Sequence, residues 1–163
     1  MQLTGKQIIE RGIVYNHIPK AVQQQGVDVR VDKIYQLRFA GKIMQMSSVI
    51  PARHEIPTHD EDGIEMYYLE PGYYEVDLME GVKMPNNAAL VYKTRSSLVR
   101  SGAIVESGQF DAGFCTDKAG CFLIVHRGIY IEKGARIAQA IVHESDVVTN
   151  TYDGQFQNDK QRK

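Results

Sequence analysis

The sequence predicts an all-β fold, a distorted β-barrel or jelly roll, with one short helix near the N-terminus. The first observation is a period-two alternation, in which valines at 27, 29 and 31 alternate with Asp28 and Arg30. The second is a series of short apolar runs separated by turn signals rich in Gly, Pro, Asn and Asp. Many short strands with regular turns are typical of barrels and jelly rolls.

The helix is expected directly after the first three residues. Thr4 is followed three residues later by Gln7, the spacing of a capping box, and then by Ile8 and Ile9. Gly12 is a typical helix end. These signals predict one short helix before the strands begin.

The strands follow in order along the rest of the chain. Ile43, Met46 and Val49 form a second apolar strip, and Pro71-Gly72 between Tyr68 and Tyr74 predicts a hairpin with a type II turn. Further short strands are expected at Val82 to Pro85, Ala88 to Tyr92, Ala103 to Val105, Phe122 to His126, Ile129 to Ile131 and Ile137 to Val142.

Length and charge limit the organisation and the partners. The 163 residues fit one domain, which we expect to span residues 1–150, followed by a flexible C-terminal arm at 151–163. The formal net charge of −1 gives no general attraction to nucleic acid or to an anionic membrane, so neither is expected as a partner. Cys115 and Cys121 provide no disulfide framework, and the chain opens with no signal-peptide pattern, which favours a cytoplasmic protein.

Arg95, Ser96 and Ser97 form a candidate phosphate site. A guanidinium, two hydroxyls and the backbone N–H groups of a turn can converge on a polyphosphate. A Ser-rich loop with a solvated Arg is the simpler reading of this tripeptide alone.

Asp111 is a candidate general base. Apolar and small neighbours can partly desolvate its carboxylate, which suits proton abstraction, although an Asp before Ala-Gly is also common in turns. Phe114, three residues on, could stack on a sugar ring or simply belong to the core. Arg136 and Gln139 stand at the entry of the last expected strand.

The C-terminal segment has two readings. Tyr152, Phe156 and Lys160 lie in a polar stretch with few core anchors, which is typical of a frayed terminus. Alternatively, the segment is an arm that places its aromatic and basic side chains over a ligand.

Three motifs that follow one another along the chain are, taken together, a more specific indication of a protein family than any one of them alone. RSSLVR (95–100), FDAGF (110–114) and EKGARIAQAIV (132–142) resemble the dUTPase/dCTP deaminase superfamily. The opening nine residues, the VDVRV segment at 27–31 and the segment 71–85 are similar to the deaminase-like branch of that superfamily. Arg100, which closes the first motif, matches an arginine of the deaminases.

The resemblance implies a dUTPase-like (β-clip) barrel that assembles as a homotrimer, with sites between subunits. The phosphates of a deoxynucleoside triphosphate would be bound by Arg95, Ser96, Ser97 and Arg100 of one subunit. Asp111 of a neighbour would contact the 3′-hydroxyl and the catalytic water, with Phe114 against the deoxyribose.

The resemblance also assigns the remaining parts of the site. Backbone groups from about Ala103 to Phe110, which include Val105 and Gly108, would read the base. Gln139 would support the phosphate and water network, and the C-terminal arm would close over the ligand. Mg²⁺ would be held mainly by the triphosphate, so no dense protein metal site is needed.

One missing carboxylate separates the two activities of the superfamily. The deaminases carry a catalytic Glu on the strand after the DAGF-like turn, and this chain has no Glu between Ser107 and Ile131. Val125 falls at that position if Cys115 to Lys118 is an insertion, and Cys121 falls there otherwise. The hypothesis is therefore a dUTPase that releases dUMP and pyrophosphate, with Asp111 as its base.

Two alternatives remain open. One is a dCTP deaminase, mono- or bifunctional, and the other is a nucleotide-binding regulatory protein with the same fold. The sequence also departs from common dUTPases, because the AGYD motif and the Gly-rich C-terminal motif are absent and Phe114 replaces the usual Tyr. A zinc deaminase is excluded, since the chain lacks the P-C-x-x-C signature.

Overall fold

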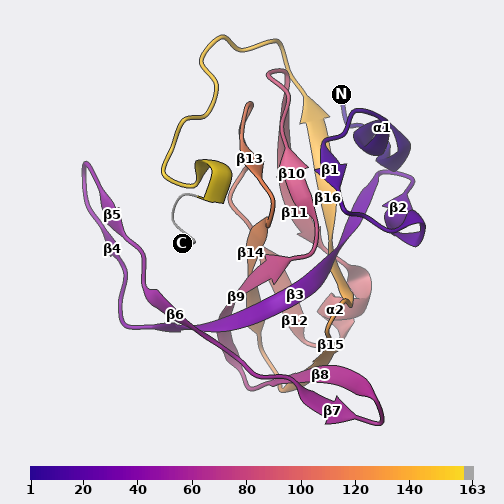
Figure 1. Ribbon diagram of the computed structural model, residues 1–163, viewed down its shortest axis with the longest axis vertical. Coiled ribbons are helices and arrows are strands. Elements are labelled where there is room, and N and C mark those ends of the chain that lie inside the picture. The colour runs from indigo at the N-terminus through magenta and orange to yellow at the C-terminus, as the bar shows by residue number, and fades with distance from the viewer. Residues whose placement is uncertain (160–163) are drawn as a thin grey trace.

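One strongly curved sheet dominates the computed structural model, which describes residues 1–159 (Figure 1). Its main path runs in the order β11-β16-β3-β9-β14-β12, and β2 and β6 each pair with β3. Its strands are β2 (Val22–Gln23), β3 (Gly26–Arg38), β6 (Ala52–Glu55), β9 (Gly72–Leu78), β11 (Ala88–Thr94), β12 (Ala103–Glu106), β14 (Gly120–Val125) and β16 (Arg136–Glu144).

Three smaller sheets and four short helices complete the described chain. The smaller sheets combine β1 (Val14–Tyr15) with β10 (Gly81–Lys83) and β13 (Cys115–Thr116), β7 (His59–Glu61) with β8 (Ile64–Leu69) and β15 (Ile129–Glu132), and β4 (Lys42–Ile43) with β5 (Ser48–Val49). The helices are α1 (Gly5–Glu10), η1 (Pro19–Ala21), α2 (Ser96–Arg100) and η2 (Gln157–Asp159). None of the described helices is long and apolar enough to cross a membrane.

Side chains connect the two ends of the main sheet into a barrel. The Thr94 hydroxyl of β11 accepts a hydrogen bond from the Val105 N–H of β12 (2.8 Å) and donates to the Val105 carbonyl (3.1 Å). Next to it, the Tyr92 N–H donates to the Ser107 hydroxyl (3.0 Å). The barrel predicted from the sequence is therefore closed here by hydroxyl groups in place of a regular strand ladder.

The core confirms most of the strand predictions. The β3 valines at 27, 29 and 31 are fully buried, alternate residues of β14 are buried, and most residues of β16 are buried. The N-terminal helix is also confirmed, because the Gln7 N–H donates to the Thr4 hydroxyl and the Gln7 side chain accepts from the Thr4 N–H.

The hairpin predicted between Tyr68 and Tyr74 is wrong. β8 pairs with β7 and β15, whereas β9 pairs with β3 and β14, and Gly72 lacks the positive φ that a type II turn requires at this position. The tight hairpin of this region is one element earlier, at Asp62 and Gly63, which both have positive φ between β7 and β8.

Two further segments differ from the prediction. Ser96–Arg100 forms the helix α2, where the sequence suggested only a turn. The strip with Ile43, Met46 and Val49 is not a core strand, because β4 and β5 form a separate ribbon whose apolar side chains are exposed. This ribbon projects away from the barrel (Figure 1).

Candidate active site

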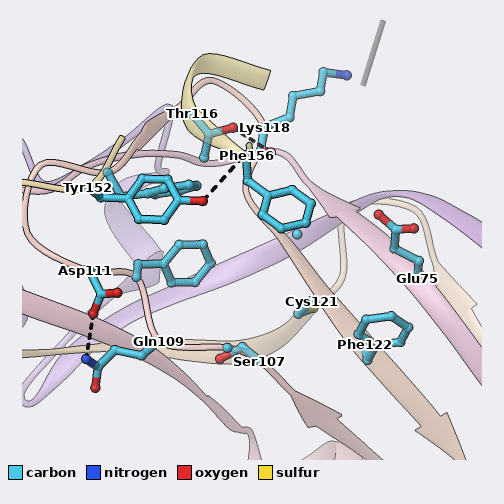
Figure 2. A pocket seen from close by; sticks show the side chains of 14 residues that line it. Glu75, Ser107, Gln109, Asp111, Thr116, Lys118, Cys121, Phe122, Tyr152 and Phe156 are labelled. Atoms are coloured by element: carbon cyan, nitrogen blue, oxygen red, sulfur yellow. Dashed lines mark hydrogen bonds between the residues drawn. The ribbon is translucent and has the colours of Figure 1, made fainter. Parts of the chain in front are cut away.

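A cavity of about 270 Å³ lies between the main sheet, the loop that follows β12 and the C-terminal segment. Asp111, Phe114, Tyr152 and Phe156 all line it, although the last two are far from the first two in the sequence (Figure 2). The structure thus brings together the residue predicted to be the general base, the residue predicted to contact the sugar and two residues of the predicted C-terminal arm.

Asp111 lies in a loop that is fixed at both ends. Phe110 before it exchanges two backbone hydrogen bonds with Leu90 (2.8 and 3.0 Å), and Gly113 after it turns the chain with φ +83°. The Asp111 carboxylate accepts a hydrogen bond from the Gln109 side chain (2.8 Å) and is otherwise exposed. The predicted desolvation is therefore wrong for the single chain, since nothing in the loop covers this carboxylate.

An aromatic row forms one wall of the cavity. Phe114 is buried and packs against Phe110 (ring centroids 5.1 Å apart) and Tyr152 (5.3 Å). Tyr92 continues the row at 5.2 Å from Phe110. Phe114 accordingly belongs to the core and also lines the cavity, so the two readings of this residue are compatible.

The opposite end of the cavity is built by β14 and β9. Cys121 and Phe122 of β14 line it, while Val125 is buried outside it. Glu75 of β9, which pairs with Phe122, places a carboxylate at this end. No sequence motif points to Glu75, because only the strand pairing brings it next to β14.

Glu75 belongs to a small cluster of charged side chains around Arg53 at this end of the cavity. Arg53 donates to Glu75 (3.2 Å) and to the buried Asp77 (3.0 Å), and its guanidinium lies 4.0 Å from the centre of the Tyr35 ring. Burial and the Asp77 carboxylate, which accepts a hydrogen bond from Tyr35, raise the pKa of the Tyr35 phenol. This cluster fixes the end of the cavity and partly neutralises Glu75.

The C-terminal segment crosses the mouth of the cavity. Tyr152 N–H donates to the Ala112 carbonyl (2.8 Å), and the Gln157 side chain bonds both the Cys115 N–H and the Gly113 carbonyl (2.9 Å each). The Phe156 N–H donates to the Tyr152 hydroxyl (3.3 Å), which holds the Phe156 ring over the cavity (Figure 2). Lys160 lies outside the described residues, and the mobility of the arm stays a prediction.

A second cluster, around Asp28, contains one of the predicted phosphate-binding residues, Arg95. Asp28 is buried on β3, and its carboxylate binds Arg95 Nε (3.1 Å), Arg136 Nη1 (3.1 Å) and, more weakly, the Gln139 amide (3.4 Å). Arg95 also donates to the Arg136 carbonyl (3.1 Å). These bonds use only part of the five donors of each guanidinium, so donors remain for an anion.

Asp28 was missed as a member of the site. Its alternation with buried valines suggested an ordinary outward side chain, yet both faces of β3 are buried at this point. The one available signal was a lone acid in an apolar strand, which needs a charged partner when it is buried.

The remaining predicted groups lie near these two clusters. Ser96, Ser97 and Arg100 are exposed on α2, and Arg95 precedes this helix, whose first N–H groups have no partner within a helix. Gly108 lines the cavity, whereas Val105 does not, and both backbone polar groups of Val105 bond with Thr94.

Within the described chain, Asp111 and the cluster around Asp28 do not line the same cavity. The residues that line the cavity include neither Arg95, Arg136 nor Gln139. The groups suited to phosphate and the carboxylate suited to proton transfer therefore stand on separate parts of the surface of one chain.

The sequence profile of the dCTP deaminase-like family matches residues 2–145. The chain belongs to this family. The match covers Asp111 and the Asp28 cluster, and it confirms the resemblance to the dUTPase/dCTP deaminase superfamily. The C-terminal segment over the cavity lies outside the matched range.

Relatives within the superfamily are similar over nearly the whole chain. A probable deoxyuridine 5′-triphosphate nucleotidohydrolase of Halobacterium salinarum is 35% identical over 158 residues, which cover 93% of this chain and 94% of that protein. The deoxyuridine 5′-triphosphate nucleotidohydrolase of Methanocaldococcus jannaschii is 34% identical over 135 residues, which cover 82% and 85%.

A solved structure confirms the fold of this dCTP deaminase-like chain. The 2′-deoxycytidine 5′-triphosphate deaminase of Agrobacterium tumefaciens superposes with a TM-score of 0.61 over 86% of this chain, at 17% sequence identity. The chain spans about half the length of that deaminase (47%).

Proposed function

We propose that this protein hydrolyses dUTP to dUMP and pyrophosphate. Asp111 takes a proton from a water molecule, whose oxygen bonds to the α-phosphorus while the bond from that phosphorus to the bridging oxygen breaks. Pyrophosphate leaves with the electron pair of that bond. The observation that carries the proposal is the cavity itself, which is lined by Asp111 and to which β14 contributes Cys121 and Phe122 and no carboxylate. The names of the archaeal relatives support the same activity.

The proposed site is shared between copies of the chain in a homotrimer. Arg95, Ser96, Ser97 and Arg100 of one copy bind the triphosphate, next to Asp111 and Phe114 of another. The separation of Asp111 from the Asp28 cluster on the single chain supports this arrangement. The exposure of Asp111 supports it too, because the carboxylate is accessible to a neighbouring copy. We place the enzyme in the cytoplasm.

We propose that a magnesium ion arrives with the substrate and is held mainly by its phosphates. The described residues contain no group of three or more His, Cys, Asp or Glu side chains placed to hold a metal, and the phosphate cluster is rich in arginine. Bound Mg²⁺ would neutralise part of the triphosphate charge. Arg95, Ser96 and Ser97 would orient the phosphates beside it, and Asp111 would hold the proton of the water.

A product assay tests the activity. The protein is incubated separately with dUTP and with dCTP in magnesium buffer, and the products are separated by chromatography. We expect dUMP and pyrophosphate from dUTP, no change in dCTP, and loss of turnover when EDTA removes the metal. Absence of product from dUTP would refute the proposal.

Glu75 supports deamination of dCTP as the second candidate function. It is the carboxylate that β9 supplies next to β14, where the deaminases carry their Glu, although Arg53 already engages it. Conversion of dCTP to dUTP or dUMP in the same assay would favour this candidate over pure hydrolysis.

Replacing Arg95 by Ala should weaken triphosphate binding. The change removes charge-assisted hydrogen bonds, so we expect the dissociation constant of a non-hydrolysable dUTP analogue to rise about 30-fold in calorimetric titration. Arg127→Ala, which removes an exposed arginine that does not line the cavity, is the control. Normal affinity of the Arg95 variant would remove this residue from the site.

Replacing Phe156 by Ala should open the cavity to water. Loss of an aromatic contact predicts a rise in KM for dUTP of about tenfold, with a smaller change in kcat. The matched control is Val148→Ala, which shortens an apolar side chain just before the arm and outside the cavity. Steady-state kinetics in which both variants match the wild type would contradict a closing role of the arm.

A further inference from the structure

The ribbon formed by β4 and β5, with its flanking residues, is an arm (residues 38–53) that exposes large apolar side chains on both faces. Phe39, Ile43 and Met46 are 88, 87 and 91% exposed. Ile43 is opposite Ser48 and Lys42 is opposite Val49, so Ile43 and Val49 point to different faces of the ribbon. A two-stranded ribbon is marginally stable alone in water, and exposed apolar surface of this kind marks a docking site.

The charges of the arm define what it can dock against. No acidic residue occurs between Lys33 and His54, while Arg38 and Lys42 are exposed. A suitable partner surface is therefore apolar with acidic residues around it.

The same chain carries such a surface on its acidic hairpin (residues 59–69), formed by β7 and β8. Exposed acids at 60, 61 and 62 surround its turn, and no Lys or Arg occurs between Arg53 and Lys83. Ile64 and Tyr68 point outward, since the alternate residues Tyr67 and Leu69 are buried.

Tyr130 extends this outward face onto the next strand. It pairs with Tyr68 across β8 and β15, their ring centroids lie 4.8 Å apart, and its side chain is 60% exposed. The acidic hairpin thus combines an aromatic face with a carboxylate rim, the complement of the arm in both respects.

We propose that the arm of one copy of this chain docks on the acidic hairpin of a second copy. Within one chain the two elements project from different sides of the barrel, so they do not meet (Figure 1). Arg38 and Lys42 lie against the acids at 60–62, and the apolar side chains of the arm cover Tyr68 and Tyr130. Because the two surfaces differ, the contact is head-to-tail and can close a ring of copies.

The contact is tested by reversing the charges on one surface, on the other, and on both together. The readout is the mass of the assembly, which does not depend on any enzymatic activity. Sedimentation velocity over a concentration series compares the wild type with R38E/K42E, with D60K/E61K and with all four changes together. We expect each double variant to raise the dissociation constant of assembly at least about tenfold, and the combination to return it to within about threefold. The control K6E/K83E makes an equal charge change at exposed lysines outside both surfaces.

A zero-length cross-link checks which chains touch. Mixed ¹⁴N- and ¹⁵N-labelled protein is treated with a carbodiimide, and heavy–light peptides that join Lys42 to Asp60, Glu61 or Asp62 are expected. A monomeric wild type, double variants that assemble normally, a combination that does not recover, or links within one isotope only would each overturn the proposal. Binding of a monomeric wild type to anionic vesicles through the arm would likewise overturn it, and assign the arm to a membrane surface.

Discussion

Asp111→Asn should lower kcat for dUTP hydrolysis about 10³-fold, because an amide cannot take the proton of the attacking water. The substituted side chain keeps nearly the same shape, and its oxygen can still accept the hydrogen bond from Gln109. We therefore expect the affinity for a non-hydrolysable dUTP analogue to stay within about threefold of the wild-type value. Single-turnover kinetics and calorimetric titration measure the two quantities separately.

Asp117→Asn is the matched control for this change. Asp117 follows β13, is exposed and accepts a hydrogen bond from Tyr15 (2.8 Å), but does not line the cavity. Its variant should turn over normally. Unchanged turnover in the Asp111 variant would assign the proton transfer to another group and leave Asp111 as a loop residue.

Asp28→Ala should lower both the stability and the triphosphate affinity of the protein. The buried carboxylate holds Arg95 and Arg136, which are themselves partly solvated, so its removal should cost about 2–4 kcal/mol in the free energy of unfolding. Without it Arg95 and Gln139 lose their fixed positions, and we expect the dissociation constant of the dUTP analogue to rise about tenfold. Urea unfolding at fixed protein concentration and calorimetry give the two values.

A second buried ion pair separates these two effects. Glu80 is fully buried and binds the backbone N–H and the guanidinium of Arg30 (2.7 and 2.6 Å), outside the Asp28 cluster. Glu80→Ala should therefore destabilise the protein by a similar amount and leave triphosphate affinity unchanged. Equal affinity in the two variants would mean that Asp28 serves the fold alone.

The predictable part of the fold depends on local patterns. The capping box of Thr4 and Gln7 and the valines of β3 were readable because side-chain periodicity and caps act within a few residues. Pro71-Gly72 misled for the same reason, since its local turn signal says nothing of β15, the distant strand with which β8 pairs. The helix α2 has only five residues, too few to display a helical period.

The motifs single out candidate site residues by type, but they do not give the environment of those residues. Asp111, Phe114 and the arginines stay predictions from their motifs, whereas the exposure of Asp111 and the burial of Asp28 depend on elements far apart in the sequence. Asp28 meets Arg136 across 108 positions, a contact that only the pairing of β3 with β16 creates. Glu75 reaches the cavity in the same way, through the pairing of β9 with β14.

The position of β16 has a consequence for how the protein is made. This strand lies between β3 and β11, although it is the last of the described strands to be synthesised. Until residue 144 has left the ribosome, β3 and β11 each present an unpaired edge next to a buried apolar face. The nascent chain is therefore prone to aggregation until β16 has emerged, and truncation before β16 would leave it in that state.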